Sequence, residues 1–141
     1  MISGLSHVAI AVPDLEAAIT LMQDTFGFTL EGRHVNEAQG VRMAYIGIGN
    51  GGRIELLEPL REDSPVGRFI QRNPNGGFHH VSMGVPDLDA ALAALTSAGV
   101  RTVSAPGARN VHDEPIAFLH PASMMGVMIE LEESAGPPHA A

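Results

Sequence analysis

The stretch "HHVSMGVPDLDAAL" (residues 79–92) decides the fold, because the chain contains it twice in nearly the same form. Residues 6–19, "SHVAIAVPDLEAAI", follow the same pattern. With His7 aligned to His80, an offset of 73 residues, both copies continue through Val-Pro-Asp-Leu and a pair of alanines. Two copies are too few for a solenoid. We therefore expect two similar halves produced by duplication.

Each half begins with the pattern of a strand followed by a helix. "HVAIAV" alternates and is rich in β-branched residues, which is typical of a strand. Asp14 is a suitable N-cap and Gly27 a suitable end for the helix between them, and Gly99 ends the second copy. Three strands should follow in each half, at residues 29–34, 42–48 and 53–58, then 102–104, 116–120 and 127–132. The sequence predicts βαβββ twice, an α+β fold.

The domain organisation follows from the repeat. We expect one domain over residues 1–133, with a first module at 1–58 and a second at 78–133. A linker helix lies between them at 59–77, where Ser64 can cap a helix whose first residue is proline. The tail, residues 134–141, is predicted to be disordered.

Composition excludes several functions. The formal net charge is −8 and all eight basic residues are arginine, which argues against a nucleic-acid surface. There is no cysteine, so a disulfide, a thiolate metal site or a cysteine nucleophile is excluded. No apolar run approaches the roughly 20 residues of a membrane span. We expect a soluble, cytoplasmic protein without a signal peptide, membrane contact or nucleic-acid partner.

Strand alternation separates packing residues from residues that can form a site. If Val8 and Ile10 pack under the first helix, His7 and Ala9 face the other way. In the second copy, the equivalent face holds His80, Ser82 and Gly84. Each histidine therefore shares its face with small residues, which leaves room for a ligand. His79 points to the opposite side and is a poor candidate.

Two carboxylates occupy matching places in the last strand of each half. Glu55 lies between Ile54 and Leu56, and Glu130 lies in the second copy of the same "IEL". A carboxylate among apolar strand residues is costly unless it is paired, hydrogen-bonded or bound to metal. Each residue alone is better explained as structural. Together the duplicated His and Glu pairs favour one divalent-metal site, for an ion such as cobalt, manganese, nickel, zinc or iron.

At this point the chain resembles a known family. The motifs that carry the resemblance cover most of residues 5–133: "HVAIAVPDLEAA", "QGVRMAYI", "IELLEPL", "SPVGRFI", "GGFHHV", "IAFLHP" and "GVMIELEE". They are similar to those of the methylmalonyl-CoA epimerases, within the vicinal oxygen chelate (glyoxalase/bleomycin resistance/dioxygenase) superfamily. The combination of "ELLEPL", "SPVGRFI", "HHV" and "FLHP" is specific.

The resemblance implies a fold, a reaction and a ligand set. It implies two modules side by side that form an eight-stranded, incompletely closed sheet around a metal-binding cleft. It implies interconversion of 2R and 2S methylmalonyl-CoA, or of a close malonyl-type thioester, through a metal-stabilised enolate. The implied ligands are His7, Glu55, His80 and Glu130, and Glu130 is also the implied base. The expected cofactor is divalent cobalt, manganese, nickel, zinc or magnesium, the expected partner is an acyl-CoA, and the expected assembly is a homodimer.

Three positions depart from the family pattern. Met43 stands where some relatives have a second catalytic glutamate, so the second acid/base could be Glu37, a water or a loop residue. Ala122 replaces a usual lysine, and the loop at residues 110–114 is acidic where a glycine-rich loop with a basic residue is usual. The residues that contact the substrate are therefore not assigned, and the cleft candidates are Ala9, Ser82 and His120.

Two alternative functions use the same fold. A glyoxalase-type isomerase has the same set of two histidines and two glutamates and a similar enediolate. A non-catalytic module that binds a small drug has no need of a symmetric His and Glu set. Analysis of bound metal separates these classes.

Overall fold

The computed structural model describes residues 1–134, which form two compact units. The central unit is Val8–His79, and the terminal unit combines Met1–His7 with the chain from His80 onward. The division falls inside the first strand, between His7 and Val8. The predicted disordered tail lies, apart from Ser134, outside the described residues.

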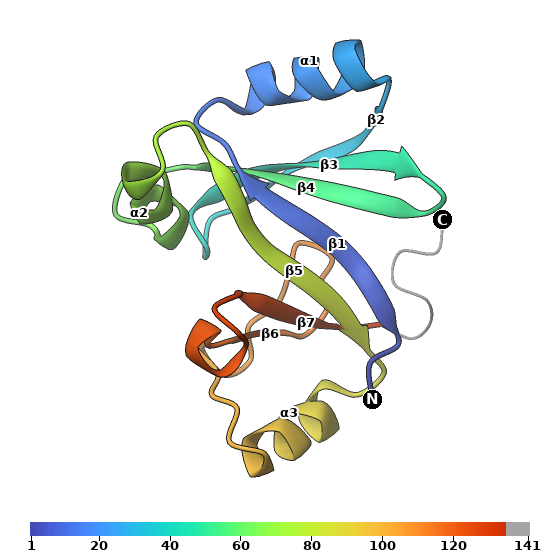
Figure 1. Ribbon diagram of the computed structural model, residues 1–141, viewed down its shortest axis with the longest axis vertical. Helices are drawn as coiled ribbons and strands as arrows, with labels where there is room; N and C mark the ends of the chain where they lie inside the picture. Colours follow the sequence, from blue (N-terminus) through green and yellow to red (C-terminus); the bar gives the residue numbers. More distant parts are fainter. Residues whose placement is uncertain (135–141) are drawn as a thin grey trace. The chain divides into compact units, whose positions relative to one another are not determined.

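The central unit is a sheet with one helix on its face and a second helix after its last strand (Figure 1). Strand β4 pairs parallel with β1 and antiparallel with β3, which pairs antiparallel with β2. Helix α1 packs against β2, β3 and β4, and α2 packs against β4. The elements are β1 (Gly4–Ala11), α1 (Leu15–Phe26), β2 (Thr29–Asn36), β3 (Val41–Gly49), β4 (Gly52–Pro59) and α2 (Pro65–Arg72).

The core of the central unit lies between α1 and its sheet. Leu15 and Ile19 of α1 are buried against Ile46 of β3 and Leu56 of β4. These strand residues alternate with residues that face away from α1, as the sequence predicts. The opposite face of this sheet is therefore not part of the hydrophobic core around α1.

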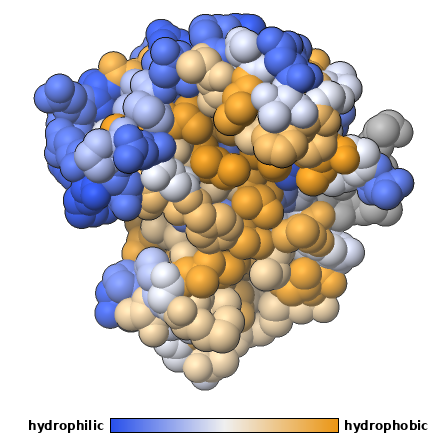
Figure 2. All heavy atoms as spheres, turned by 45° about the horizontal axis from the view of Figure 1, so that its top comes forward, coloured by the Kyte–Doolittle hydropathy of each residue, from blue (hydrophilic) through white to orange (hydrophobic). Residues whose placement is uncertain are grey.

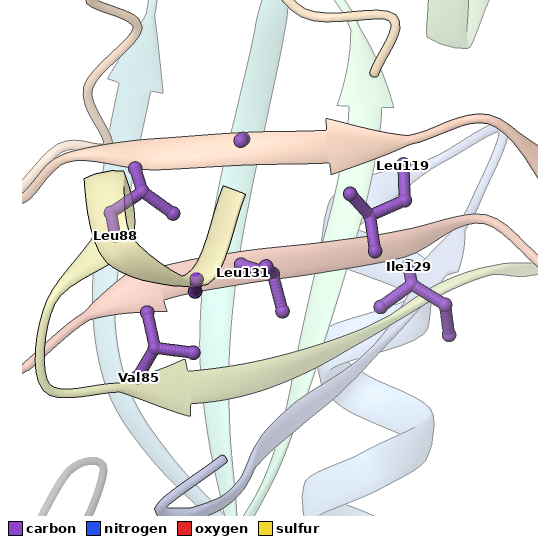
Figure 3. Close-up of a cluster of buried hydrophobic side chains, with 7 residues drawn as sticks. Val85, Leu88, Leu119, Ile129 and Leu131 are labelled. Carbon is purple, nitrogen blue, oxygen red and sulfur yellow. The ribbon is translucent and has the colours of Figure 1, made fainter. Parts of the chain in front are cut away.

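The terminal unit repeats the arrangement with its own helix. Its elements after β1 are β5 (Gly77–Val85), α3 (Leu88–Ser97), β6 (Ile116–Leu119), a short 3-10 helix η1 (Pro121–Ser123) and β7 (Ile129–Glu133). The strand order is β1-β5-β7-β6, with β5 parallel and β6 antiparallel to β7. Figure 3 shows Val85, Leu88, Leu119, Ile129 and Leu131 converging from α3 and three strands to form this unit's core.

Both main helices begin in the same way. Asp14 and Asp87 are the N-caps, and their side chains accept hydrogen bonds from Ala17 N and Ala90 N. A glutamate from the last strand of each unit accepts a hydrogen bond from the first N–H of the helix. Glu58 accepts from Leu15 N at 2.6 Å, and Glu133 accepts from Leu88 N at 2.8 Å. Two otherwise unsatisfied N–H groups are thus paired at each helix start. The two halves of the repeat therefore match in these hydrogen bonds as well as in sequence.

The prediction of eight strands is wrong for the described residues, in which seven are found. The strand expected at residues 102–104 is reduced to one bridge, between Thr102 and Leu119. Two backbone hydrogen bonds flank the bridge, from His120 N to Arg101 O and from Val103 N to Phe118 O. The pairing stops there because the chain turns at Ala105-Pro106-Gly107, where proline has no N–H to donate. The helix expected after Ser64 is found as α2, which Ser64 caps.

The surface is mixed in character. Figure 2 shows hydrophobic residues exposed beside hydrophilic ones, and the exposed apolar side chains include Leu5, Phe26 and Phe78. In the described part of the chain, none of the helices has the length and apolar character needed to span a membrane.

Candidate metal centre

Three of the four predicted ligands come together in the terminal unit. His7 lies on β1, His80 on β5 and Glu130 on β7, and all three are buried, with exposed fractions of 2 %, 2 % and 5 %. Val81 and Ile129 pack into the α3 core, so the alternating residues His80 and Glu130 project from the other face. Strand alternation predicted this face correctly.

The three ligand atoms form a small triangle. His7 Nε2 lies 3.4 Å from His80 Nε2 and 3.5 Å from Glu130 Oε1, and His80 Nε2 lies 3.7 Å from the same oxygen. Two ligand atoms each about 2.1 Å from a tetrahedral ion are about 3.4 Å apart. The spacing of the triangle therefore fits a small divalent cation bound by two imidazoles and a carboxylate.

His80 is held in the neutral form that binds metal. Burial lowers its pKa from 6.5 to about 4, although the negative charge of Glu132 acts in the opposite direction. Its ring also packs edge-on against Phe118, with ring centroids 5.4 Å apart. A neutral imidazole has a lone pair to donate, so His80 is ready to ligate at neutral pH.

A further buried carboxylate, Glu132, was missed by the sequence analysis. Its Oε2 accepts a hydrogen bond from Ser6 Oγ at 2.8 Å, and its Oε1 lies 3.6 Å from His7 Nδ1. Ser6 Oγ is also 3.0 Å from that same nitrogen. The available signal was strand alternation, because Glu132 follows Glu130 by two residues and shares its face.

Ser82 supplies an unsatisfied polar atom beside the triangle. Its side chain is fully buried, and its Oγ has no hydrogen-bond partner among residues 1–134. The register of β5 and β7 places Ser82 directly opposite Glu130. A buried hydroxyl without a partner is costly, so this position suits a bound polar group.

The fourth predicted ligand, Glu55, belongs to the central unit. It lies on β4, is 5 % exposed, and pairs in register with Ala9 on one side and Tyr45 on the other. These residues share the sheet face that points away from α1. His34 packs its ring against Tyr45 on that face, with centroids 5.2 Å apart, and pairs in register with Met43. The place of Glu55 in a metal site stays a prediction.

The remaining candidate residues have local structural contacts. His120 caps η1, its Nδ1 accepting from Ala122 N at 3.0 Å, and Ala122 itself is exposed. His79 packs edge-on against Phe69, with ring centroids 5.3 Å apart. A role for His120 in binding substrate stays a prediction.

The acidic loop at residues 110–114 is organised by one asparagine. Asn110 Oδ1 accepts from His112 N and Glu114 N, and its Nδ2 donates to Glu114 Oε1. The carboxylate of Glu114 is therefore held within its own turn. Hydrogen bonds made by the side chain of Asn110, together with one from Arg109 Nη1 to Asp113 O, hold this loop in place.

Comparison with known proteins decides the family. Residues 6–118 match the family model described as the Glyoxalase/Bleomycin resistance protein/Dioxygenase superfamily.

The chain belongs to this superfamily.

Several of its relatives within the superfamily are named as epimerases. It is 41 % identical over 134 residues to an ethylmalonyl-CoA/methylmalonyl-CoA epimerase of Cereibacter sphaeroides, covering 94 % of this chain and 99 % of that one. The structure of methylmalonyl-CoA epimerase from Mycobacterium tuberculosis has a TM-score of 0.89 and 38 % identity, with 95 % and 89 % of the two chains covered.

A Streptomyces coelicolor methylmalonyl-CoA epimerase variant, in complex with 2-nitronate-propionyl-CoA, has a TM-score of 0.88 and 38 % identity, with coverage of 96 % and 100 %. The superfamily and the epimerase resemblance predicted from sequence motifs are confirmed.

Proposed function

We propose that this chain is a metal-dependent epimerase that interconverts the 2R and 2S forms of methylmalonyl-CoA. The observation that carries the proposal is the triangle of His7 Nε2, His80 Nε2 and Glu130 Oε1, with edges of 3.4, 3.5 and 3.7 Å. It occurs in a chain whose relatives, at about 40 % identity over nearly its full length, are named as epimerases of this class.

The proposed ligand set is His7, Glu55, His80 and Glu130. The support for Glu55 is that it repeats Glu130 in the first module and that it is buried on the face away from α1. A buried carboxylate needs a compensating partner, and a cation supplies one. The arrangement of the two modules around one ion, which the resemblance implies, is part of the same proposal.

The bound ion would act as a Lewis acid that stabilises negative charge on the substrate's oxygens. The protein's own residues supply the rest. Glu130 removes the proton from the carbon between the thioester and the carboxylate, because it is the carboxylate in the triangle. His7 and His80 contribute neutral ligands, so only the two glutamates of the set would offset the charge of a divalent ion. Burial excludes water and strengthens these interactions.

The second proton carrier differs from that of some relatives. Met43 is buried on β3 and has no proton to exchange, so return of a proton to the opposite face falls to another group. Glu37 is exposed in the turn between β2 and β3, and a water or a loop residue are the other candidates. This substitution predicts unequal use of the two faces, with Glu130 dominant.

The proposed partners follow the relatives. An acyl-CoA is the expected substrate, and the Cereibacter relative's name includes ethylmalonyl-CoA, so a slightly larger acyl group is a second substrate to test. Homodimerisation, a cytoplasmic location and the identity of the ion among cobalt, manganese, nickel, zinc and magnesium are proposals of the same kind.

The test is interconversion of optically pure methylmalonyl-CoA by purified protein, stripped of metal and then reloaded with one divalent ion at a time. We expect epimerisation at C2 with metal and none after chelation. Glu130→Gln should lower the rate by at least about 1,000-fold, because the base is lost. Glu133→Gln is the matched control, since it makes the same change three residues further along β7 and on the other face of the strand.

Activity with ethylmalonyl-CoA alone would shift the substrate assignment. Turnover of a glutathione hemithioacetal instead of either thioester would favour the glyoxalase alternative. Tight ligand binding that is unaffected by chelator, without turnover, would favour a binding module and contradict the proposal.

A further inference from the structure

In the terminal unit, a hydrogen-bonded series of three side chains, Glu132, Ser6 and His7, ends at the imidazole of His7. Ser6 Oγ donates to Glu132 Oε2 at 2.8 Å, and His7 Nδ1 lies 3.0 Å from Ser6 Oγ. All three side chains are buried, with exposed fractions of 3 %, 2 % and 4 % for Ser6, His7 and Glu132. The direct distance from His7 Nδ1 to Glu132 Oε1 is 3.6 Å, too long for a good hydrogen bond. The serine therefore links the carboxylate to the ring.

The number of protons shared by Glu132, Ser6 and His7 determines the tautomer of the His7 ring. A serine hydroxyl has one proton to donate, and the carboxylate of Glu132 has none. Because that proton is donated to Glu132, Ser6 Oγ can only accept from His7, so Nδ1 must carry the hydrogen. In a neutral imidazole the other nitrogen then has the lone pair.

We infer that Ser6 and Glu132 are positioning residues that hold His7 as its Nδ1–H tautomer, so that Nε2 is the metal-ligating atom. Nε2 is the nitrogen that faces His80 Nε2 and Glu130 Oε1. A hydrogen bond to the second nitrogen of a ligating histidine fixes its tautomer and orientation and raises its basicity. This inference rests on the proposed metal function for its purpose.

The tautomer can be read directly in metal-free protein. Long-range proton–nitrogen correlation spectra of ¹⁵N-labelled protein distinguish a protonated Nδ1 from a protonated Nε2. We expect the Nδ1–H form of His7 in the wild type at neutral pH. A wild-type His7 with its proton on Nε2 would overturn the inference, whatever the catalytic activity.

Two variants test the two links separately. In Glu132→Met the hydroxyl of Ser6 loses its acceptor and is free to donate to Nδ1, so His7 should shift to the Nε2–H form. In Ser6→Ala the link is removed and the preference should be lost, while Ser6→Thr keeps a hydroxyl and should keep the tautomer. Glu133→Met is the matched control, because Glu133 bonds Leu88 N at the start of α3 and not Ser6.

Zn²⁺ affinity measured by calorimetry provides a second readout that does not depend on substrate. We expect Glu132→Met and Ser6→Ala to weaken binding by about 10- to 100-fold, as second-shell losses typically do. Glu133→Met and Ser6→Thr should bind as the wild type does. Unchanged tautomer and unchanged affinity in both Glu132→Met and Ser6→Ala would overturn the inference. If wild-type protein bound no Zn²⁺, the metal proposal would fail, while the spectra would still decide the tautomer.

Discussion

At the scale of single residues, the candidate site is a set of buried polar groups that are costly to keep in an apolar sheet. His7, His80 and Glu130 are each at most 5 % exposed, and they face one another within 3.7 Å. Without a cation, such a cluster is held together only by hydrogen bonds and partial neutralisation. The cost of burying these groups is the physical reason to expect a metal ion there.

The lowered pKa of His80 predicts how metal-free protein responds to acid. The unfolded chain binds a proton near pH 6.5 and the folded chain only near pH 4, so the unfolded state takes up more protons between these values. Stability is therefore fully present above pH 6.5 and decreases as the pH falls toward 4. We expect metal-free protein to lose about 2 kcal/mol of unfolding free energy from this group between pH 7 and pH 5.

Urea unfolding at the two pH values measures this effect. In His80→Asn, the free energy of unfolding should fall by about 2 kcal/mol less between pH 7 and pH 5 than in the wild type. Replacement of the exposed His112 should leave this pH dependence unchanged. If the free energy of unfolding of His80→Asn depended on pH as steeply as that of the wild type, a group other than His80 would cause the pH dependence.

At the scale of elements, most of the structure could be predicted from sequence, because local signals and the duplication agreed. The Asp caps, Gly27 at the end of α1 and Pro65 at the start of α2 each identified a boundary. The exception is residues 102–104, where the βαβββ repeat predicts a strand. That prediction failed because strand length depends on the partner: the chain turns away beyond Val103, and a single bridge is left.

The repeated helix start supports a prediction for α3. Replacing Asp87 by alanine removes the acceptor for Ala90 N and should lower the free energy of unfolding by about 1 kcal/mol. Asp87→Asn keeps the acceptor and should cost only a few tenths of that. Thermal or urea denaturation of the two variants measures the difference. An equal loss of unfolding free energy in both variants would show that the charge of Asp87, and not its hydrogen bond to Ala90 N, stabilises the helix start.

At the scale of the whole molecule, each unit has its own core, built from the same positions of the repeat. The core of the terminal unit includes Leu131, which is 1 % exposed and contacts α3 and neighbouring strands (Figure 3). Glu130 is adjacent to it in sequence and points the other way. The strand that forms the core therefore also positions the site, so core packing and ligand geometry are linked through β7.

A change in this core should therefore lower the stability of the unit that holds the site. Leu131→Ala should lower the free energy of unfolding by about 3 kcal/mol, because it removes transfer free energy and leaves a cavity. Leu5→Ala, at a side chain that is 62 % exposed, should change it by less than about 0.5 kcal/mol. Urea unfolding compares the two. A small effect of Leu131→Ala would show that this core is loosely packed.

The site was less predictable than the fold, for a physical reason. Strand alternation identifies which residues share a face, and it gave His7, His80 and Glu130 correctly as residues of one face. It does not report how side chains connect, so the link from Glu132 through Ser6 to His7 Nδ1 needed coordinates. The substrate contacts were equally inaccessible, since Ala122 and the loop at residues 110–114 depart from the family pattern.

The most direct test of the central claim is calorimetric titration of metal-free protein with Co²⁺ or Zn²⁺. We expect saturable binding of a single ion per chain in the wild type and loss of this binding in His80→Ala and Glu130→Gln, with circular dichroism to confirm that both variants are folded. Replacement of the exposed His112 should leave the titration unchanged. Wild-type affinity in folded His80→Ala and Glu130→Gln would contradict the proposed metal site, because the ion would then be bound elsewhere.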